Sequence, residues 1–269
     1  MTKRKARVLA FVTSGILFTA IFGLSGDDEG SLGLRFHLGT RHTPSDVLGS
    51  LLRFRAKPPL YKKYDSAEKV GLPDPAYRGM PVEEALRKRR SVRNYSREPI
   101  FLKELSLLLF AAQGITGRSG NLPLRTAPSA GALYPFEIYV VVNNVEDLDK
   151  GIYHYSILDH SLEVLRKGDY RREIVRAALD QDMVGKAGVT FVLAAIFRRT
   201  TWKYGDRGHR YVYMEAGHIS QNIFLQATSL GLGSVGVGAF FDDRVNNLLG
   251  IDGRSEAAIY LHAVGKTRG

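Results

Sequence analysis

The sequence predicts an α+β fold, and three observations support this prediction. Two continuous runs of β-branched, aromatic and other apolar residues, 136–142 and 189–196, are typical of buried strands. The run 211–230 places apolar residues around much of a helical circumference. Helical and strand-like segments mix without strict strand–helix–strand alternation, which favours α+β over a regular parallel sheet. At 269 residues and 44% hydrophobic content, the chain is long enough for a large core.

The first 25 residues have the layout of a signal peptide or membrane anchor. Four basic residues within the first seven precede an uncharged, mostly apolar stretch, 8–25. At about 1.5 Å per residue, this stretch barely reaches across a hydrocarbon core of ~30 Å. The alternative is a buried N-terminal helix of a soluble protein. We expect a membrane-associated or exported protein, with a cytoplasmic location as the alternative.

The next part of the chain divides into a linker region and a folded domain. Residues 26–80 are rich in Gly, Pro and charge, which predicts a linker followed by an arm that wraps the domain or its partner. The domain itself is expected over 81–269. Pro81 suits the first turn of a helix over 82–90. Leucines on a common face predict a second helix over 101–113, which ends before a glycine.

Local patterns predict the remaining elements. In chain order these are a hairpin with exposed faces (151–155 and 161–166), a helix (170–179), a glycine-studded strand (231–241), a short helix capped by Asp242 (242–249) and a last strand (258–264). The helix 211–230 is apolar enough that we expect it at the centre of the protein or in a subunit interface.

Charge and cysteine content narrow the function classes. A formal net charge of +11 would attract anions such as nucleic acid, a membrane surface or an acidic cofactor. Nucleic acid is disfavoured as a partner because no recognition motif accompanies the charge. The chain has no cysteine, which excludes disulfides, thiolate metal sites and a cysteine nucleophile. His209 and His218 lack further ligands at metal spacing, so no metal site is expected.

The run Arg89-Arg90-Ser91-Val92-Arg93 is the first candidate binding motif. In an extended segment, Arg89, Ser91 and Arg93 would point to one side. The guanidinium group is a planar fork of donors that suits phosphate oxygens. The alternative is a solvated basic helix end.

Two further runs fit the same ligand. The loop 128–135 is rich in small residues, and its Ser129-Ala130-Gly131 backbone can lie close against a flat group; the alternative is an ordinary turn. Near the C-terminus, Lys266 and Arg268 add two cations just after an apolar strand. Together the three runs indicate a phosphorylated planar cofactor.

These residues resemble a known family. Arg-x-Ser-x-Arg at 89–93 is similar to the FMN-phosphate and ribityl motif of the nitroreductase superfamily. With the loop 128–135 and the runs 203–208 (Lys-Tyr-Gly-Asp-Arg-Gly) and 215–218 (Glu-Ala-Gly-His), the match resembles the SagB-type branch, the azoline dehydrogenases of thiazole/oxazole-modified peptide biosynthesis. The resemblance extends from about Pro58 to the C-terminus.

The resemblance implies a fold and a cofactor site. The fold would be a mixed sheet flanked by helices, in a dimer that binds FMN between its subunits. The cofactor would contact Arg89, Arg90, Ser91, Arg93, Pro128, Ser129, Ala130, Gly131, Val235, Gly236, Lys266 and Arg268. Ala132 stands where an Asn is frequent in the superfamily, so only backbone contacts are expected there. For the glycines of 233–238, close strand packing is the alternative role.

Lys203 and Tyr204 are the candidate catalytic residues. Oxidation of an azoline requires removal of a carbon-bound proton while hydride leaves for the flavin. A Lys with its pKa lowered by burial, or a Tyr phenolate stabilised by that Lys, can serve as the base. The family branch has a Lys-Tyr pair in this role. The alternative is a surface loop, since 202–206 has loop composition.

The predicted function is therefore an FMN-dependent oxidoreductase that transfers a hydride between flavin N5 and a small molecule or a modified peptide. The specific form is azoline-to-azole oxidation. The alternatives are an NAD(P)H-dependent nitroaromatic or quinone reductase, and a non-catalytic, membrane-tethered scaffold with a flavin fold. We also expect a homodimer built on the helix 211–230.

Overall fold

The computed structural model describes residues 31–41, 56–75 and 79–268. The chain divides into two compact units, Met1–Pro44 and Ser45–Gly269. In the first, helix α2 (Leu32–Gly39) begins after Ser31, whose hydroxyl accepts a hydrogen bond from the Leu34 N–H at 3.2 Å. The predicted signal or anchor segment, 1–25, lies outside the described residues. Within the described ranges, no helix combines the length and the apolar character that a membrane span needs.

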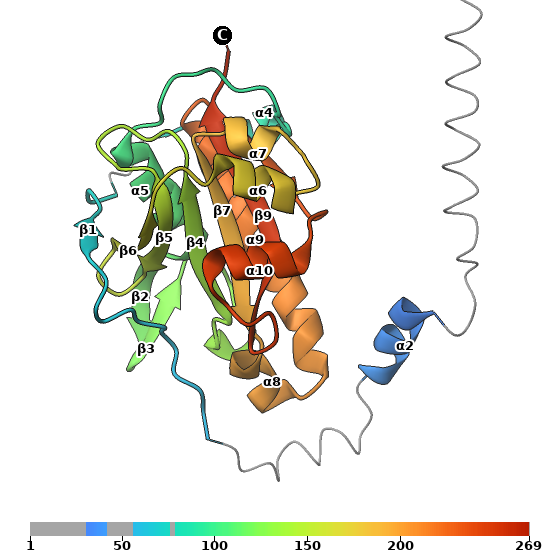
Figure 1. The fold of residues 1–269 in the computed structure, drawn as a ribbon. Coiled ribbons are helices and arrows are strands. Elements are labelled where there is room, and N and C mark those ends of the chain that lie inside the picture. Colours follow the sequence, from blue (N-terminus) through green and yellow to red (C-terminus); the bar gives the residue numbers. More distant parts are fainter. Residues whose placement is uncertain (1–30, 42–55, 76–78, 269) are drawn as a thin grey trace, which may run out of the picture. The chain divides into compact units, whose positions relative to one another are not determined.

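The second unit is built on a seven-stranded sheet with the order β1-β6-β5-β4-β7-β9-β8 (Figure 1). The strands are β1 (Lys69–Gly71), β4 (Phe136–Val142), β5 (Gly151–Ser156), β6 (Ser161–Lys167), β7 (Val189–Ile196), β8 (Leu232–Val237) and β9 (Glu256–Lys266). All ladders between these strands are antiparallel. Ser91 adds a parallel bridge to Ser234 at the β8 edge, which makes the pairing mixed, as predicted.

Helices cover both faces of this sheet. Helices α5 (Leu102–Gln113) and α9 (Arg207–Ser229) pack on one face, and α6 (Arg171–Ala177), α7 (Met183–Lys186) and α10 (Asp242–Leu249) pack on the other, in front of the sheet in Figure 1. Strand β7 shows why its sequence is apolar throughout: Phe191 belongs to the core under α9, whereas Val192 belongs to the core under α6 and α10. The α+β fold prediction is confirmed.

Two helices differ from the sequence prediction. Helix α8 (Arg198–Tyr204) was not predicted, and it includes residues 202–204, for which a surface loop was the alternative; α9 begins four residues before its predicted start. A two-stranded hairpin, β2 (Ile115–Ser119) and β3 (Leu122–Arg125), and the short helices α4 (Val82–Lys88) and η1 (Ala130–Ala132) complete the unit.

The predicted hairpin of β5 and β6 is present, but the exposed faces were a wrong expectation. All of β5 is buried, because α5 covers Tyr153 and Tyr155 on one face, and the chain around Tyr64 covers the other. There, the Tyr64 ring meets the His154 ring edge-on, with centroids 5.2 Å apart.

Within the second unit, residues 59–71 of the 26–80 region pack directly on this sheet. The Pro59 carbonyl accepts a hydrogen bond from Arg199 Nε at 2.8 Å, and the Lys62 N–H donates to Glu137 at 3.1 Å. The Lys62 ammonium also reaches Glu256 of β9 at 2.5 Å. Further on, β1 adds an edge strand to β6. Residues 59–71, which precede the predicted domain start at Pro81, therefore belong to the same structural unit as the sheet.

Candidate functional site

The loop 128–135 between β3 and β4 has an unusual backbone. Gly131, Ala132 and Tyr134 have φ angles of 62°, 50° and 45°, all in the left-handed region that non-glycine residues rarely adopt. Such residues cost on the order of 1–3 kcal/mol each, persist only where the surroundings hold them, and cluster at functional sites. The strain therefore marks this loop as a candidate site.

Several contacts hold the loop at Tyr134, whose hydroxyl accepts a hydrogen bond from the Arg125 N–H at 3.2 Å. The Tyr134 N–H donates to the Ser129 hydroxyl at 2.8 Å, and its carbonyl accepts from Arg199 at 3.3 Å. The Arg125 guanidinium lies over its ring, 4.4 Å from the centroid. Both arginines are buried, and Arg199 forms an ion pair with Glu137 at 2.5 Å. The loop is thus held by two buried guanidinium groups, and the one of Arg199 has a buried carboxylate partner in Glu137.

The predicted catalytic pair packs directly against this loop. A Cβ atom added at Gly131 would lie 2.7 Å from the Tyr204 hydroxyl and 3.1 Å from the Lys203 ammonium. The Lys203 ammonium lies 5.2 Å from the centroid of the Tyr204 ring. Lys203 is exposed, so the structure does not agree with a lysine base whose pKa is lowered by burial. It is compatible with the other predicted base, a Tyr204 oxygen with the Lys203 ammonium near its ring.

Glu215 of α9 lies behind the loop and was not predicted as a site residue. Its side chain is 2% exposed, and burial raises its pKa to about 7, against the opposing effects of the Ser129 hydroxyl, the Arg125 charge and Gln113. The sequence does contain a signal for Glu215. It lies on the same buried face of the helix as Val212 and Ile219, where an ionisable side chain is rare unless it is paired.

The Arg89–Arg93 run leaves α4 and follows the edge of β8 in an extended form. The Val92 N–H donates to the Ser234 carbonyl at 2.8 Å, and Ser91 and Arg93 are exposed. Arg89 lies over the ring of Phe224 at 5.1 Å. Arg90 instead donates to the carbonyls of Arg87 and Arg89 in its own turn.

The two C-terminal cations have different surroundings. The Lys266 ammonium pairs with Glu104 at 2.7 Å and lies over the Phe101 ring, so an anion would compete with Glu104 for it. Arg268 lines a hollow of about 590 Å³ that also has Lys150, Arg171 and Lys186 in its wall. The structure thus places Lys266 beside α5 and Arg268 in a basic hollow.

The other residues predicted to contact the cofactor have their own surroundings. Pro128 and Gly131 are exposed, and Ser129 and Ala130 are half-buried. The Val235 side chain is buried in the core under α6 and α10. A Cβ atom at Gly236 would collide with the Tyr260 hydroxyl, so close packing is one reason for glycine there.

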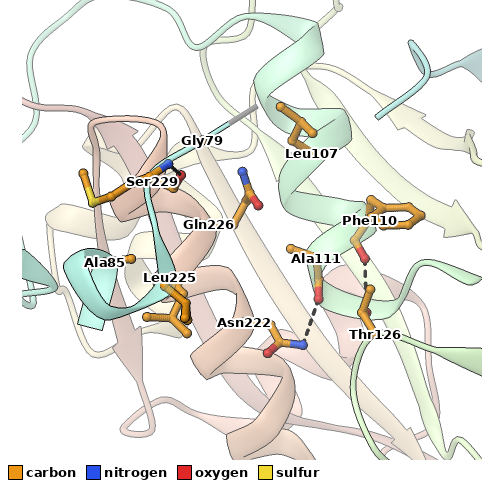
Figure 2. Close-up of a pocket in the computed structure, with 12 residues that line it drawn as sticks. Gly79, Ala85, Leu107, Phe110, Ala111, Thr126, Asn222, Leu225, Gln226 and Ser229 are labelled. Carbon is orange, nitrogen blue, oxygen red and sulfur yellow. Dashed lines mark hydrogen bonds between the residues drawn. The ribbon is translucent and has the colours of Figure 1, made fainter. Parts of the chain in front are cut away.

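A separate hollow of about 520 Å³ lies between α4, α5 and α9 (Figure 2). Two hydrogen bonds tie its polar groups to backbone: Asn222 donates to the Ala111 carbonyl at 3.0 Å, and Thr126 donates to the Phe110 carbonyl at 3.1 Å. Leu107 and Leu225 are among its apolar lining residues. The hollow contains none of the predicted site residues. Over the described ranges, no cluster of three or more His, Cys, Asp or Glu side chains is placed to hold a metal ion.

Comparisons with known proteins identify the family. The model of the nitroreductase family matches residues 86–266. A protein of Methanocaldococcus jannaschii that is named as a nitroreductase is 45% identical over 197 residues, which cover 73% of this chain and 96% of the relative. The microcin B17-processing protein McbC of Escherichia coli is 31% identical over 147 residues, covering 52% of this chain and 54% of McbC.

A solved structure supports the same assignment. A crystal structure from Anabaena variabilis, named as a nitroreductase, aligns with a TM-score of 0.66 and 33% identity, over 76% of this chain and 42% of that chain. The family match covers strands β4 to β9 of the sheet, the strained loop and the Lys203–Tyr204 pair together. The chain belongs to the nitroreductase family of oxidoreductases.

Proposed function

We propose that this protein is an FMN-dependent oxidoreductase that oxidises an azoline ring of a modified peptide to an azole. One observation carries the proposal: Tyr204 and Lys203 pack against Gly131, although more than 70 residues separate them in the sequence. A general base has to lie beside the group that binds the reacting ring. The similarity to McbC, named for microcin B17 processing, supports a peptide substrate.

The residues present fit FMN. Ser129, Ala130 and Gly131 are small and none of them is fully buried, so their backbone could approach a flat group closely. Arg89, Ser91 and Arg93 would bind the phosphate from the β8 edge through charge-assisted hydrogen bonds. The flavin would supply the hydride acceptor when bound.

The chain's own residues would handle the proton. The Tyr204 oxygen would take a proton from the ring carbon as the hydride leaves that ring, which forms the new double bond. The Lys203 ammonium would stabilise the phenolate form of Tyr204 that accepts this proton, and the transfer would leave Tyr204 as a neutral phenol. The Ser129–Tyr134 backbone, held by Arg125 and Arg199, would keep Tyr204 in place.

The second candidate is an NAD(P)H-dependent reductase of nitroaromatics or quinones. The 45% identical relative named as a nitroreductase favours it. Such a reaction needs no proton from carbon, so it gives Lys203 and Tyr204 no defined task. A scaffold without catalysis would need neither this pair nor the exposed Ser91 and Arg93.

The deciding experiment uses the purified full chain. Its flavin is released, identified and quantified, and the protein is then assayed with a synthetic thiazoline peptide and, separately, with NAD(P)H and a nitroaromatic. Oxidation of the thiazoline peptide supports the azoline function. Turnover only of the nitroaromatic supports the second candidate, and protein without FMN contradicts both.

We further propose a homodimer through the outer face of α9. Tyr213 and Met214 of this helix are 48% and 56% exposed, and Gly217 and His218 extend the same uncovered face. An apolar helix face of this kind is usually covered by another surface. A monomer by sedimentation at micromolar concentration, with flavin bound, would contradict this proposal.

A separate proposal concerns the N-terminal segment. We propose that 8–25 tethers the protein to a membrane or directs its export. Fractionation of cells that produce the full chain and a chain lacking residues 1–25 tests this, and an identical soluble distribution of both would contradict it.

A further inference from the structure

Three neighbouring strands place ionisable side chains next to one another inside the protein. His154 of β5 pairs directly with Glu163 of β6 across the ladder, and Glu137 of β4 lies on its other side. His154 Nδ1 lies 2.7 Å from Glu163 Oε2, and His154 Nε2 lies 2.9 Å from Glu137 Oε2. At most 3% of each side chain is exposed. The imidazole is thus held between two buried carboxyl groups.

The hydrogen-bond geometry fixes the charge of His154. A neutral imidazole has one N–H donor and one nitrogen that only accepts, and a carboxylate only accepts. Since both ring nitrogens face carboxylate oxygens, both must donate, and the ring is an imidazolium. A protonated Glu163 is disfavoured, because its other oxygen accepts the Tyr64 N–H at 3.4 Å and lies 4.0 Å from the Lys69 ammonium.

The chain of charges continues from His154 to α8. Burial acts to raise the pKa of Glu137, but the His154 hydrogen bond and the Arg199 charge together bring this pKa below its ordinary value. Glu137 Oε1 pairs with Arg199 of α8 at 2.5 Å. Negative and positive groups therefore alternate from β6 to α8, and their formal charges sum to zero.

Arg199 connects this chain to the candidate site. It lies in helix α8 together with Lys203 and Tyr204. Its guanidinium also donates to the Pro59 carbonyl at 2.8 Å and to the Tyr134 carbonyl at 3.3 Å. One buried group thus joins the helix of the proposed base, the strained loop and the segment that precedes β1.

A carboxylate can orient Arg199 only if it is itself held in place. Glu137 is held on both oxygens, since Oε1 also accepts the Lys62 N–H at 3.1 Å and Oε2 faces His154. We propose that the buried imidazolium of His154 and its partner Glu163 are positioning residues, which fix Glu137 and through it Arg199 and α8. The catalytic part of this inference rests on the proposed function, whereas the charge of His154 does not.

Stability alone does not account for these charges. Buried ion pairs are often no more stabilising than apolar side chains of similar volume, because taking the charges out of water is costly. A neutral set of apolar residues would close this part of the sheet equally well. It would not orient the guanidinium of Arg199, which needs a fixed carboxylate.

NMR of the ¹⁵N-labelled full chain reads the charge of His154, because the ring nitrogens of neutral and charged imidazoles differ in chemical shift. At about pH 8, where a solvent-exposed histidine is almost entirely neutral, both His154 nitrogens should still carry protons. Their signals are assigned by their loss in His154→Gln. His160 of the same hairpin is the internal reference. Its nitrogens contact the hydroxyls of Ser106 and Tyr155 at 2.8 and 2.7 Å, and burial lowers its pKa, so it should be neutral.

Glu163→Gln tests the source of this charge and keeps nearly the same side-chain shape. Two cations, His154 and Arg199, would then face the single carboxylate of Glu137. We therefore expect His154 to keep the proton on Nε2 and to lose the one on Nδ1. This variant also provides a test if His154→Gln does not fold.

The consequence for α8 is measured in two ways. Trp202, the only tryptophan of the chain, lies in α8, and its single indole N–H signal should shift in His154→Gln. The kcat for the thiazoline peptide should fall about tenfold or more in His154→Gln, with KM and FMN content unchanged, since a small displacement of a catalytic group is enough. A role in stability alone would lower the folded fraction and leave the kcat of flavin-bound protein unchanged. The control His160→Gln should keep both the signal and kcat.

Several results would overturn the inference. These are a neutral His154 in the wild type, a doubly protonated His154 in Glu163→Gln, and an unmoved Trp202 signal in His154→Gln. Equal losses of kcat in His154→Gln and His160→Gln would do the same, because the effect would then not depend on the charge. If the wild type oxidises no thiazoline peptide, the proposed function fails, and the NMR measurements alone decide the role of His154.

Discussion

Replacing Glu215 by Gln should stabilise the protein at alkaline pH and have little effect at acidic pH. The reason is that the folded state disfavours the charged form of this carboxyl, since burial raises its pKa from 4.5 to about 7. Between these two values the folded protein binds more protons than the unfolded chain. Stability therefore falls as the pH rises through this window, and the penalty is complete above about 7.

The size of the effect follows from the two pKa values. The difference between 4.5 and about 7 corresponds to about 3 kcal/mol, at about 1.36 kcal/mol per pH unit. Glutamine has nearly the same shape and cannot ionise, so this penalty is absent in the variant. For a domain of this size, about 3 kcal/mol raises Tm by roughly 6–12 °C.

The assay is urea unfolding of both proteins at about pH 5 and pH 8, on either side of most of the window. Glu83→Gln, which changes an exposed glutamate of α4, is the matched control and should have no pH-dependent effect. If the stability difference between Glu215→Gln and the wild type were the same at both pH values, Glu215 would not titrate as burial requires, and the reasoning would fail.

Four more variants probe the cofactor site, the strained loop and the proposed base. Arg93→Ala should weaken FMN binding at least tenfold by equilibrium dialysis, since a charge-assisted contact contributes ~1.5–3 kcal/mol; the exposed α4 control Arg87→Ala should not. Gly131→Ala should lose ~1–2 kcal/mol of stability in urea from its left-handed φ, and unchanged stability would contradict that strain. Tyr204→Phe and Lys203→Ala should slow thiazoline oxidation ~10²–10⁴-fold with flavin retained. Reduction of the flavin by NAD(P)H should change far less, and equal losses in both assays would mean that the pair only positions the loop.

The strands under both helical layers could be predicted from sequence because burial on two faces leaves a continuous apolar run. The bounds of β4 and β7 match the predicted runs 136–142 and 189–196. Helix α8 could not be predicted in this way. Its Arg199 is buried only because Glu137 and the Pro59 carbonyl, both distant in the sequence, receive the guanidinium. Local composition contains no trace of such long-range compensation.

For the candidate site too, local patterns could be predicted from the sequence, whereas contacts between distant elements could not. Residue types and spacing led to the Arg89–Arg93 run, the loop 128–135 and the pair at 203 and 204, because each is a local pattern. The contact of Gly131 with Tyr204, and the pairing of Lys266 with Glu104, depend on how distant elements meet. These contacts change how the patterns are interpreted: a residue that seemed free to bind an anion has a carboxylate partner in the fold.

The strained loop and the buried arginines belong to one physical arrangement. Left-handed φ angles at Ala132 and Tyr134 are unfavourable and need surroundings that hold them. Arg125 and Arg199 hold Tyr134, and their guanidinium groups also bind the carbonyls of Leu60 and Pro59. Loss of Arg199 would leave the buried Glu137 carboxylate without this guanidinium partner, which is far more costly than loss of a surface contact. The fold thus fixes a loop that an isolated chain would avoid, and Tyr204, the proposed base, packs against this fixed loop.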